Sequence, residues 1–410
     1  MKYEVLKRSY VKRNIIIAIV IVLVLSAIIL TFTRAKYRTT QSMPLLNGTI
    51  NYTLADLNIV AMYLDGSEID TLPDGNYELT SESYCTNEEN VKDDSITLNY
   101  DGSTNTFTVA PFNKKGTKCY LYFDEKASGG DYILAGDNPP TNSTTDWTGG
   151  TSYYYTGNPN NWVQFAGFWW RIIRINGDGT IRMIYQGTSA NTTGTGTQIG
   201  ESFFNSSYNN NMYVGYMYTS GQRQGTGSSS AIKGVLDQWY SVTSGLTAYS
   251  DYIDGNAGFC GDRRVSSGNG IGTSVTNYQP YTRISNSSPS LSCEDADIYT
   301  TTDSSTGNKS LTYPIGLISA DEAMFAGIPI WNNSSPSNYL CTEEYYWTMS
   351  PSFFEGISAY VFNIDSSGSL VDNYYVNRTH RVRPVINLRA DVSLTGSGTT
   401  SDPFKVVGAS

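Results

Sequence analysis

Histidine is almost absent from this sequence, with His380 as the single example among 410 residues. This scarcity excludes zinc sites that need two or more histidines, such as the helical H-E-x-x-H motif. A Ser-His-Asp triad lacks support because no Gly-x-Ser-x-Gly elbow or similar nucleophile stands out. The phosphate-binding Gly-x-x-x-x-Gly-Lys motif is also missing. His380 is therefore interpreted as a loop residue, and we expect neither a cofactor nor catalysis.

Charged residues are scarce too, at 16% of the chain. Residues 39–410 hold 19 of the 27 basic and 36 of the 37 acidic side chains, a net charge of −17. Such a charge repels phosphate backbones, so nucleic acid is excluded as a partner. The adjacent acids Asp321-Glu322 and Glu343-Glu344 are interpreted as solvated helix caps. A cell-wall hydrolase stays open as an alternative, because two acids far apart in sequence can face one cleft.

Long hydrophobic runs are limited to one. Ile15 to Thr33 contains no charge, proline or glycine and reaches about 28 Å as a helix, enough to cross a bilayer core of about 30 Å. Five basic residues precede it and three follow, which places residues 1–14 in the cytoplasm. We therefore expect a single-pass cell-membrane protein, anchored in lipid by residues 15–33, with its remaining domains extracellular. A cleaved signal peptide and a pilin-type leader are the alternatives.

Five cysteines are present, and in an extracellular protein most should be paired. Cys85 and Cys119 fall in one proposed domain, and Cys260 and Cys293 in another. We therefore predict disulfides within each pair. Cys341 is then left over and is expected to be buried and free.

Tyrosine, glycine, serine, threonine and asparagine are abundant, with 32 tyrosines and 38 glycines, which favours a mostly β, α+β fold. Residues 47–124 contain several short β-prone runs and the turn Asp101-Gly102, which together predict a small Ig-like β-sandwich. Residues 125–152, with Gly129-Gly130 and Pro139-Pro140, are predicted to be a linker. A larger domain over residues 153–410 follows.

The strongest signal in the larger domain is a hairpin, Trp169 to Tyr185, with its turn at Asn176-Gly177-Asp178-Gly179. Both faces carry apolar side chains, so the hairpin should lie in the core. Its arginines, Arg171, Arg174 and Arg182, are interpreted as surface or ion-paired residues, with a ligand clamp as the alternative. Helices are predicted from Ser230 to Tyr240 and from Ser319 to Ala326, the second with a capping box. The late strands are predicted over residues 346–350, 359–364 and 381–388, with Pro384 at an edge or bulge.

Four segments of this domain, WWRIIRINGDGTIRMIY, GLISADEAMFAG, YWTMSP and VRPVINL, resemble a family of uncharacterised bacterial surface proteins. In that family an N-terminal anchor precedes an extracellular domain similar to the C-type-lectin-like superfold, to which formylglycine-generating enzymes are also related. The resemblance implies a lectin-like domain with two short helices.

The sequence departs from the motifs that carry chemistry in these relatives. Sugar-binding C-type lectins hold calcium with acidic loop and strand motifs, whereas Gln279-Pro280-Tyr281 and Trp331-Asn332-Asn333 lack the acids. Formylglycine-generating enzymes use two reactive cysteines near the C-terminal end, where this chain has only Cys341. We therefore expect no metal site and no such activity.

What remains is binding of an extracellular ligand, a glycan or a protein, without catalysis. Aromatic stacking and hydrogen bonding would supply the affinity. The loop after the hairpin carries four candidate contact residues, Tyr208, Tyr213, Tyr216 and Tyr218, although packing of this loop against its own domain is the simpler interpretation. A structural or pilin-like envelope subunit is the alternative function.

The anchor generates a topological prediction. Protease added to intact cells should remove the bulk of the chain, because everything after residue 33 is expected outside the membrane. Immunoblotting against a tag at the C-terminus measures the loss, with a cytoplasmic protein as the control. Digestion that occurs only after the cells are permeabilised would reverse the predicted orientation.

Overall fold

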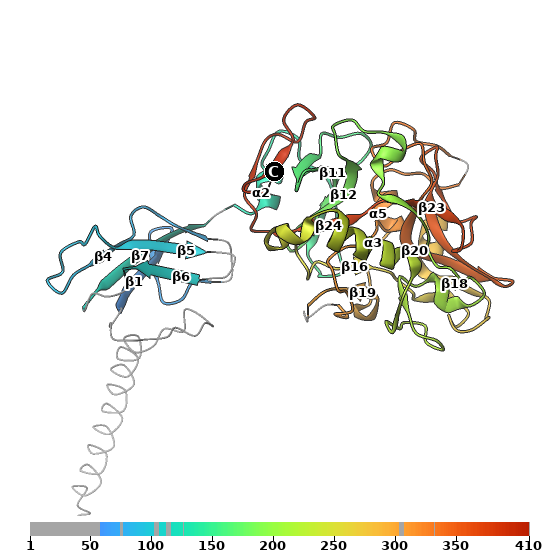
Figure 1. Ribbon diagram of the computed structural model, residues 1–410, viewed down its shortest axis with the longest axis horizontal. Coiled ribbons are helices and arrows are strands. Elements are labelled where there is room, and N and C mark those ends of the chain that lie inside the picture. Colours follow the sequence, from blue (N-terminus) through green and yellow to red (C-terminus); the bar gives the residue numbers. More distant parts are fainter. Residues whose placement is uncertain are drawn as a thin grey trace, which may run out of the picture. The chain divides into compact units, whose positions relative to one another are not determined.

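The computed structural model describes residues 58–73, 77–101, 106–111, 116–125, 127–302, 307–331 and 333–409. The predicted tail (1–14) and transmembrane helix (15–33) lie outside these residues. Within the described part of the chain, no helix has both the length and the apolar character needed to cross a bilayer. The chain divides into two compact units, Met1–Lys126 and Ala127–Ser410 (Figure 1). Strands predominate over helices in both, which confirms a mostly β, α+β composition.

The smaller unit combines a five-stranded sheet, in the order β2-β1-β7-β3 with β4 also paired to β7, and a separate β5–β6 hairpin. Cys119, Leu121 and Phe123 alternate along β7 and are buried in the core. The hairpin contributes to the same core, and the Tyr100 ring meets Phe123 edge-on at 5.0 Å. The strands are β1 (Asn58–Leu64), β2 (Ser67–Ile69), β3 (Tyr77–Leu79), β4 (Tyr84–Thr86), β5 (Thr97–Asp101), β6 (Thr106–Ala110) and β7 (Lys118–Glu125).

Both predicted disulfides are present. Cys85–Cys119 joins directly opposed positions of β4 and β7, with the two Cα atoms 4.0 Å apart. Cys260–Cys293 links two segments of the larger unit. Cys341 is free, as predicted, but it is partly exposed instead of buried. A cross-link inside the smaller unit is useful because a core of this size supplies limited stability on its own.

The segment predicted as a linker, 125–152, is instead folded into the larger unit from Ser128 onward. It contains α2 (Gly129–Leu134), β8 (Asn142–Thr145) and β9 (Thr151–Tyr154), and Ser128 forms a capping box with Asp131. Its glycines serve close packing: a Cβ on Gly129 would lie 2.8 Å from Val392 Cγ2, and one on Gly130 would lie 2.9 Å from the Gly179 carbonyl oxygen. Composition alone does not distinguish such glycines from those of a flexible connection.

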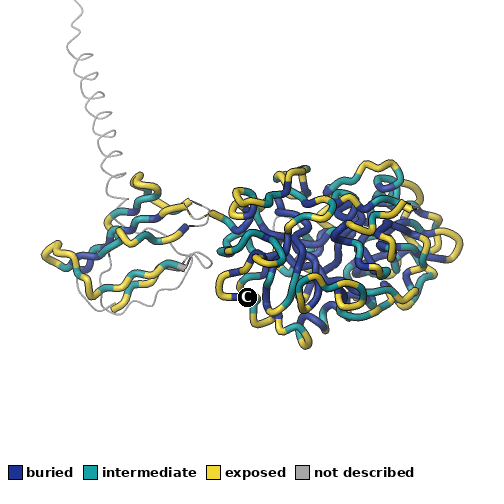
Figure 2. Tube along the Cα trace, turned by 90° about the horizontal axis from the view of Figure 1, so that it is seen from above, coloured by how far each residue is buried: buried dark blue, intermediate teal, exposed yellow. Residues whose placement is uncertain are grey.

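The larger unit contains two main sheets. The first has the order β24-β12-β11-β10-β26-β25, and β9 pairs with β11 and β8. The predicted hairpin forms its centre, and β12 is buried along its whole length. Figure 2 shows the buried residues gathered in the interior of this unit. The strands are β10 (Trp162–Phe165), β11 (Phe168–Ile175), β12 (Ile181–Gly187), β24 (Val385–Leu388), β25 (Leu394–Thr395) and β26 (Phe404–Val406).

The second sheet has the order β13-β23-β20-β18-β17, and β21 joins it through β20. The predicted strand 381–388 is divided between the two sheets, because Arg383 and Pro384 separate β23 from β24. Arg383 is fully buried and donates from Nε to the Tyr185 carbonyl oxygen at 2.9 Å. The strands are β13 (Gly200–Phe203), β17 (Val265–Ser267), β18 (Thr276–Tyr278), β20 (Tyr346–Glu355), β21 (Ser358–Ile364), β22 (Leu370–Val371) and β23 (Thr379–Val382).

The described residues of the larger unit form four α-helices where two were predicted. The two predicted helices are confirmed, and each begins at its expected serine cap, Ser230 or Ser319. The two missed helices, α2 and α4, have six and seven residues, too few to show a clear helical period. The other helices are α3 (Ala231–Gln238), extended by a π turn η3 (Trp239–Thr243), α4 (Gln279–Ser285) and α5 (Ala320–Phe325).

Short elements complete the unit. They are the 3₁₀ turns η1 (Gly194–Thr197), η2 (Asn211–Val214), η4 (Leu246–Tyr252) and η5 (Asp295–Asp297), and the strand pairs β14 (Met217–Tyr218) with β15 (Ser228–Ser229) and β16 (Phe259–Cys260) with β19 (Ile298–Tyr299).

A buried ion-pair group joins the central hairpin to α5. Glu322 Oε1 lies 3.0 Å from Arg174 Nε and 2.5 Å from Arg182 Nε, and Glu322 Oε2 accepts a hydrogen bond from the Ser319 backbone N–H at 2.8 Å. These three charged side chains are at most 2% exposed. The prediction that Asp321-Glu322 is a solvated cap was wrong, since Glu322 caps its helix inside the core.

We predict that Glu322→Ala destabilises the larger unit by about 3–5 kcal/mol, because it removes the carboxylate that two buried guanidinium groups share. Urea unfolding followed by tryptophan fluorescence measures this unit alone, because all seven tryptophans lie between residues 147 and 347. Glu355→Ala, at an exposed position of β20, is the control and should change stability by less than about 0.5 kcal/mol. Equal stability of the two variants would contradict the assigned role.

The same group adds a pH dependence. Burial alone would raise the pKa of Glu322, but the charges of Arg182 and Arg174 lower it below the ordinary value. The stabilisation is therefore complete above the unfolded-state pKa of about 4.3 and is lost as the pH falls through the lower folded-state pKa.

Candidate functional site

The four loop tyrosines do not form the single platform that was one reading of the sequence. Tyr216 is 1% exposed and its hydroxyl donates to the Ile315 carbonyl oxygen at 3.2 Å, so it belongs to the core. Tyr213 and Tyr218 pack edge to face, with ring centres 5.4 Å apart. The alternative that this loop packs against its own domain therefore accounts for Tyr216, and only Tyr208 joins a larger aromatic group.

That larger group is a row of five partly exposed rings, which we call the aromatic row. Successive ring centres lie 5.6, 4.3, 5.1 and 5.9 Å apart. Tyr375, the most open of them, is 36% exposed. Sequence reasoning identified only Tyr208 of this group. In spatial order the members are Tyr281, Phe353, Tyr360, Tyr375 and Tyr208.

Several elements position the row. Phe353 and Tyr360 lie on the paired strands β20 and β21, and their neighbours Phe354 and Ala359 are fully buried on the opposite side of the strands. Tyr281 extends from α4. The Ala359 backbone N–H donates to the Tyr208 carbonyl oxygen at 2.8 Å, which attaches the loop that carries Tyr208 to β21. The row thus combines residues that are far apart in the chain, so no local pattern indicates it.

The row is uncharged at neutral pH. Burial, followed by a hydrogen bond with Tyr375, raises the pKa of Tyr360 to about 12, so its phenol stays protonated. The Arg378 guanidinium lies 5.9 Å from the centre of the Tyr375 ring and is the nearest positive charge among the cation–ring contacts of the row. Rings, phenol hydroxyls and one guanidinium bind ligands by stacking and hydrogen bonding, which needs no metal.

His380 lies among aromatic rings, on β23 and not in the predicted loop. The ring stacks on Tyr345 at 5.5 Å and meets Trp347 and Tyr374 at 4.6 and 4.9 Å. Burial and, to a lesser extent, the charge of Arg378 lower its pKa to about 4. Among the described residues no hydrogen-bond partner reaches His380 Nε2. A neutral imidazole enclosed in this way packs as an aromatic ring.

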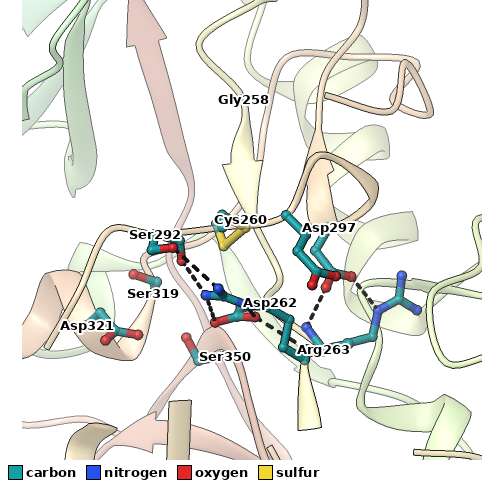
Figure 3. The surroundings of a disulfide bond; sticks show 12 residues. Gly258, Cys260, Asp262, Arg263, Ser292, Asp297, Ser319, Asp321 and Ser350 are labelled. Atoms are coloured by element: carbon teal, nitrogen blue, oxygen red, sulfur yellow. Dashed lines mark hydrogen bonds and ion pairs between the residues drawn. A yellow bond between two sulfur atoms is a disulfide. The ribbon is translucent and has the colours of Figure 1, made fainter. Parts of the chain in front are cut away.

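Acidic residues near the second disulfide form ion pairs with arginines, and Figure 3 shows those of Asp262 and Asp297. Asp262 accepts from Arg264 Nε and Arg283 Nη1, each at 2.7 Å, and Arg283 also holds Asp321 at 2.8 Å. Arg263 donates to Asp297 Oδ1 at 3.0 Å beside them. These ion pairs hold residues 262–264 against the neighbouring segments. Within the described part of the chain, no group of three or more His, Cys, Asp or Glu residues is arranged to hold a metal ion.

A cavity of about 410 Å³ opens elsewhere on the larger unit, between η3, η4 and the segment that follows residue 307. Its floor includes the stacked rings of Tyr240 and Tyr313, with centres 5.2 Å apart. Among the described residues, the lining consists of Tyr240, Thr247, Ser250, Ile253, Gly255, Thr301, Thr302, Thr312, Tyr313 and Pro314.

Comparisons with protein-family models, curated proteins and solved structures find no match to this chain.

The aromatic enclosure of His380 makes a measurable prediction. Because His380 is the only histidine, the imidazole signals in an NMR pH titration belong to it without assignment, and they should titrate near pH 4. Since this pKa lies below the unfolded-state value of about 6.5, the neutral ring contributes stability above pH 6.5 that is lost as the pH falls toward 4. In urea, the same signals should return to about 6.5. Titration near 6.5 in the folded chain would contradict the buried environment.

Proposed function

We propose that this chain is a membrane-anchored bacterial cell-surface protein whose larger unit binds an extracellular ligand, a glycan or a protein, without catalysis. The aromatic row is the observation that carries the proposal. Soluble proteins rarely leave several large aromatic side chains side by side at the surface, and such groups indicate interaction sites. Trp and Tyr are also enriched where one ring face must contact a partner while the hydroxyl or N–H stays hydrated.

The proposal includes the finer fold assignments. We propose an Ig-like sandwich for the smaller unit, supported by its sheet and covering hairpin and by the parallel pairing of β1 with β7. We propose a C-type-lectin-like fold for the larger unit, supported by its early central hairpin, its short helices and its late strands. These fold assignments rest on architecture alone, and the aromatic row carries the functional proposal.

Of the two ligand classes, the row favours a glycan. Each ring of the row contacts the next one, and four of the five members carry a phenol hydroxyl. A sugar chain offers apolar ring faces for stacking and hydroxyl groups for hydrogen bonding in the same way. The net charge of −17 on residues 39–410 disfavours acidic polymers, so we propose a neutral glycan.

We predict that Tyr375→Ala and Tyr208→Ala each weaken binding by about tenfold or more, the loss typical of an aromatic anchor. The probes are immobilised panels of neutral oligosaccharides, acidic oligosaccharides and extracellular proteins. The full-length chain is solubilised without sugar-based detergents, which would compete. Tyr132→Ala is the matched control, since Tyr132 is 39% exposed but lies outside the row.

Binding should survive EDTA, because stacking needs no calcium. Loss of binding with EDTA that calcium restores would contradict the metal-free mode. Binding to the protein panel alone would replace the glycan with a protein ligand, and binding to none of the panels would contradict the proposed function.

A further inference from the structure

The cavity beside the stacked rings of Tyr240 and Tyr313 is independent of the aromatic row, with which it shares no residue. Its volume of about 410 Å³ falls within the range of about 300–1,000 Å³ that small-molecule sites occupy. Tyr240 and Ile253 are 2% and 5% exposed and give it a fixed apolar floor. The Tyr313 ring, which stacks on Tyr240, and Pro314 are partly exposed and continue the apolar surface.

Seven of the ten described residues that line the cavity carry a side-chain hydroxyl, and we call these seven the hydroxyl rim. Thr301 donates to the Gly255 carbonyl oxygen at 3.3 Å. Among the described residues, the other hydroxyls that line the cavity have no protein partner, so they are available to a ligand or to water. They belong to Tyr240, Thr247, Ser250, Thr302, Thr312 and Tyr313.

The lining contains no charged side chain among the described residues. An ionised ligand would lose hydration on entry without gaining an opposite charge, which is costly. Burial, followed by the neighbouring Tyr313, raises the pKa of Tyr240 to about 12, so the phenol is a neutral donor at physiological pH. Size, apolar floor and hydroxyl rim together select a small neutral molecule that has both an apolar face and several hydroxyl groups.

We propose that this cavity binds a single neutral sugar residue, with the apolar face of the sugar ring on the aromatic floor and its hydroxyls on the threonine and serine rim. The residue could be a free monosaccharide or the end of a glycan chain, since both present the same ring. This site goes beyond the proposed function, because it is separate from the row.

The test is saturation-transfer NMR and calorimetry on the full-length chain, solubilised without sugar-based detergents. The probes are glucose, galactose, mannose and N-acetylglucosamine, with glucuronate and sialic acid as charged counterparts. We expect a millimolar Kd for at least one neutral sugar, as its few atoms allow, and at least tenfold weaker binding of the charged sugars. Oligosaccharides that carry the same sugar at their end distinguish the two sources: equal binding points to a chain end, and loss of binding points to the free sugar.

The variants locate the site. Tyr313→Ala and Thr312→Val should each weaken binding at least tenfold, whereas Thr243→Val, an exposed threonine outside the cavity, should not. Thr312 is itself exposed, so its variant keeps the test valid if Tyr313→Ala fails to fold. Tyr375→Ala should leave monosaccharide binding unchanged, which separates this inference from the proposed function.

Absence of binding by every neutral sugar would overturn the proposal. Binding that both cavity variants retain would overturn it as well, as would equal affinity for glucuronate.

Discussion

Glu322 holds the larger unit together at the point where its central hairpin meets a helix. One carboxylate binds arginines from β11 and β12 and also caps the N-terminus of α5 through the Ser319 N–H. Arg174 reaches further, to within 3.5 Å of Asp146 Oδ2, so the segment after β8 is attached to the same group. Replacing one of these three charged side chains is costly, because a buried charge that loses its partner is no longer compensated. The hairpin, helix and neighbouring loop are therefore fixed in one arrangement.

Sequence reasoning succeeded where the signal is local. The hairpin turn at Asn176-Gly177, the serine caps of α3 and α5 and the two disulfides were all predicted from short patterns or from domain locality. It failed where the role of a residue depends on neighbours that are far away in the sequence. Gly129 and Gly130 are packed against Val392 and Gly179, and nothing in the segment 125–152 reveals those neighbours. The same holds for Glu322, whose arginine partners lie about 140 residues earlier.

The candidate site shows this limit of sequence-based prediction more clearly. Tyr208 was a predicted contact residue and lies in the aromatic row, yet Tyr216, eight positions later, is in the core. Side-chain spacing in an irregular loop carries no periodicity, so exposure there depends on which elements the loop crosses. The rest of the row comes from α4, β20, β21 and the segment after β22, and only the folded chain brings these elements together.

The distribution of charged side chains is consistent with the proposed binding through uncharged groups. Five arginines of the described chain are buried, each with carboxylates, carbonyl oxygens or rings as partners: Arg171, Arg174, Arg182, Arg263 and Arg383. Arginine is the side chain best suited to bind acidic ligands, but these five arginines bind groups of the protein itself. The exposed acids, in contrast, repel such ligands. The proposed recognition of a neutral ligand by ring faces and hydroxyls is consistent with this arrangement, and residues of both the aromatic row and the cavity carry these groups.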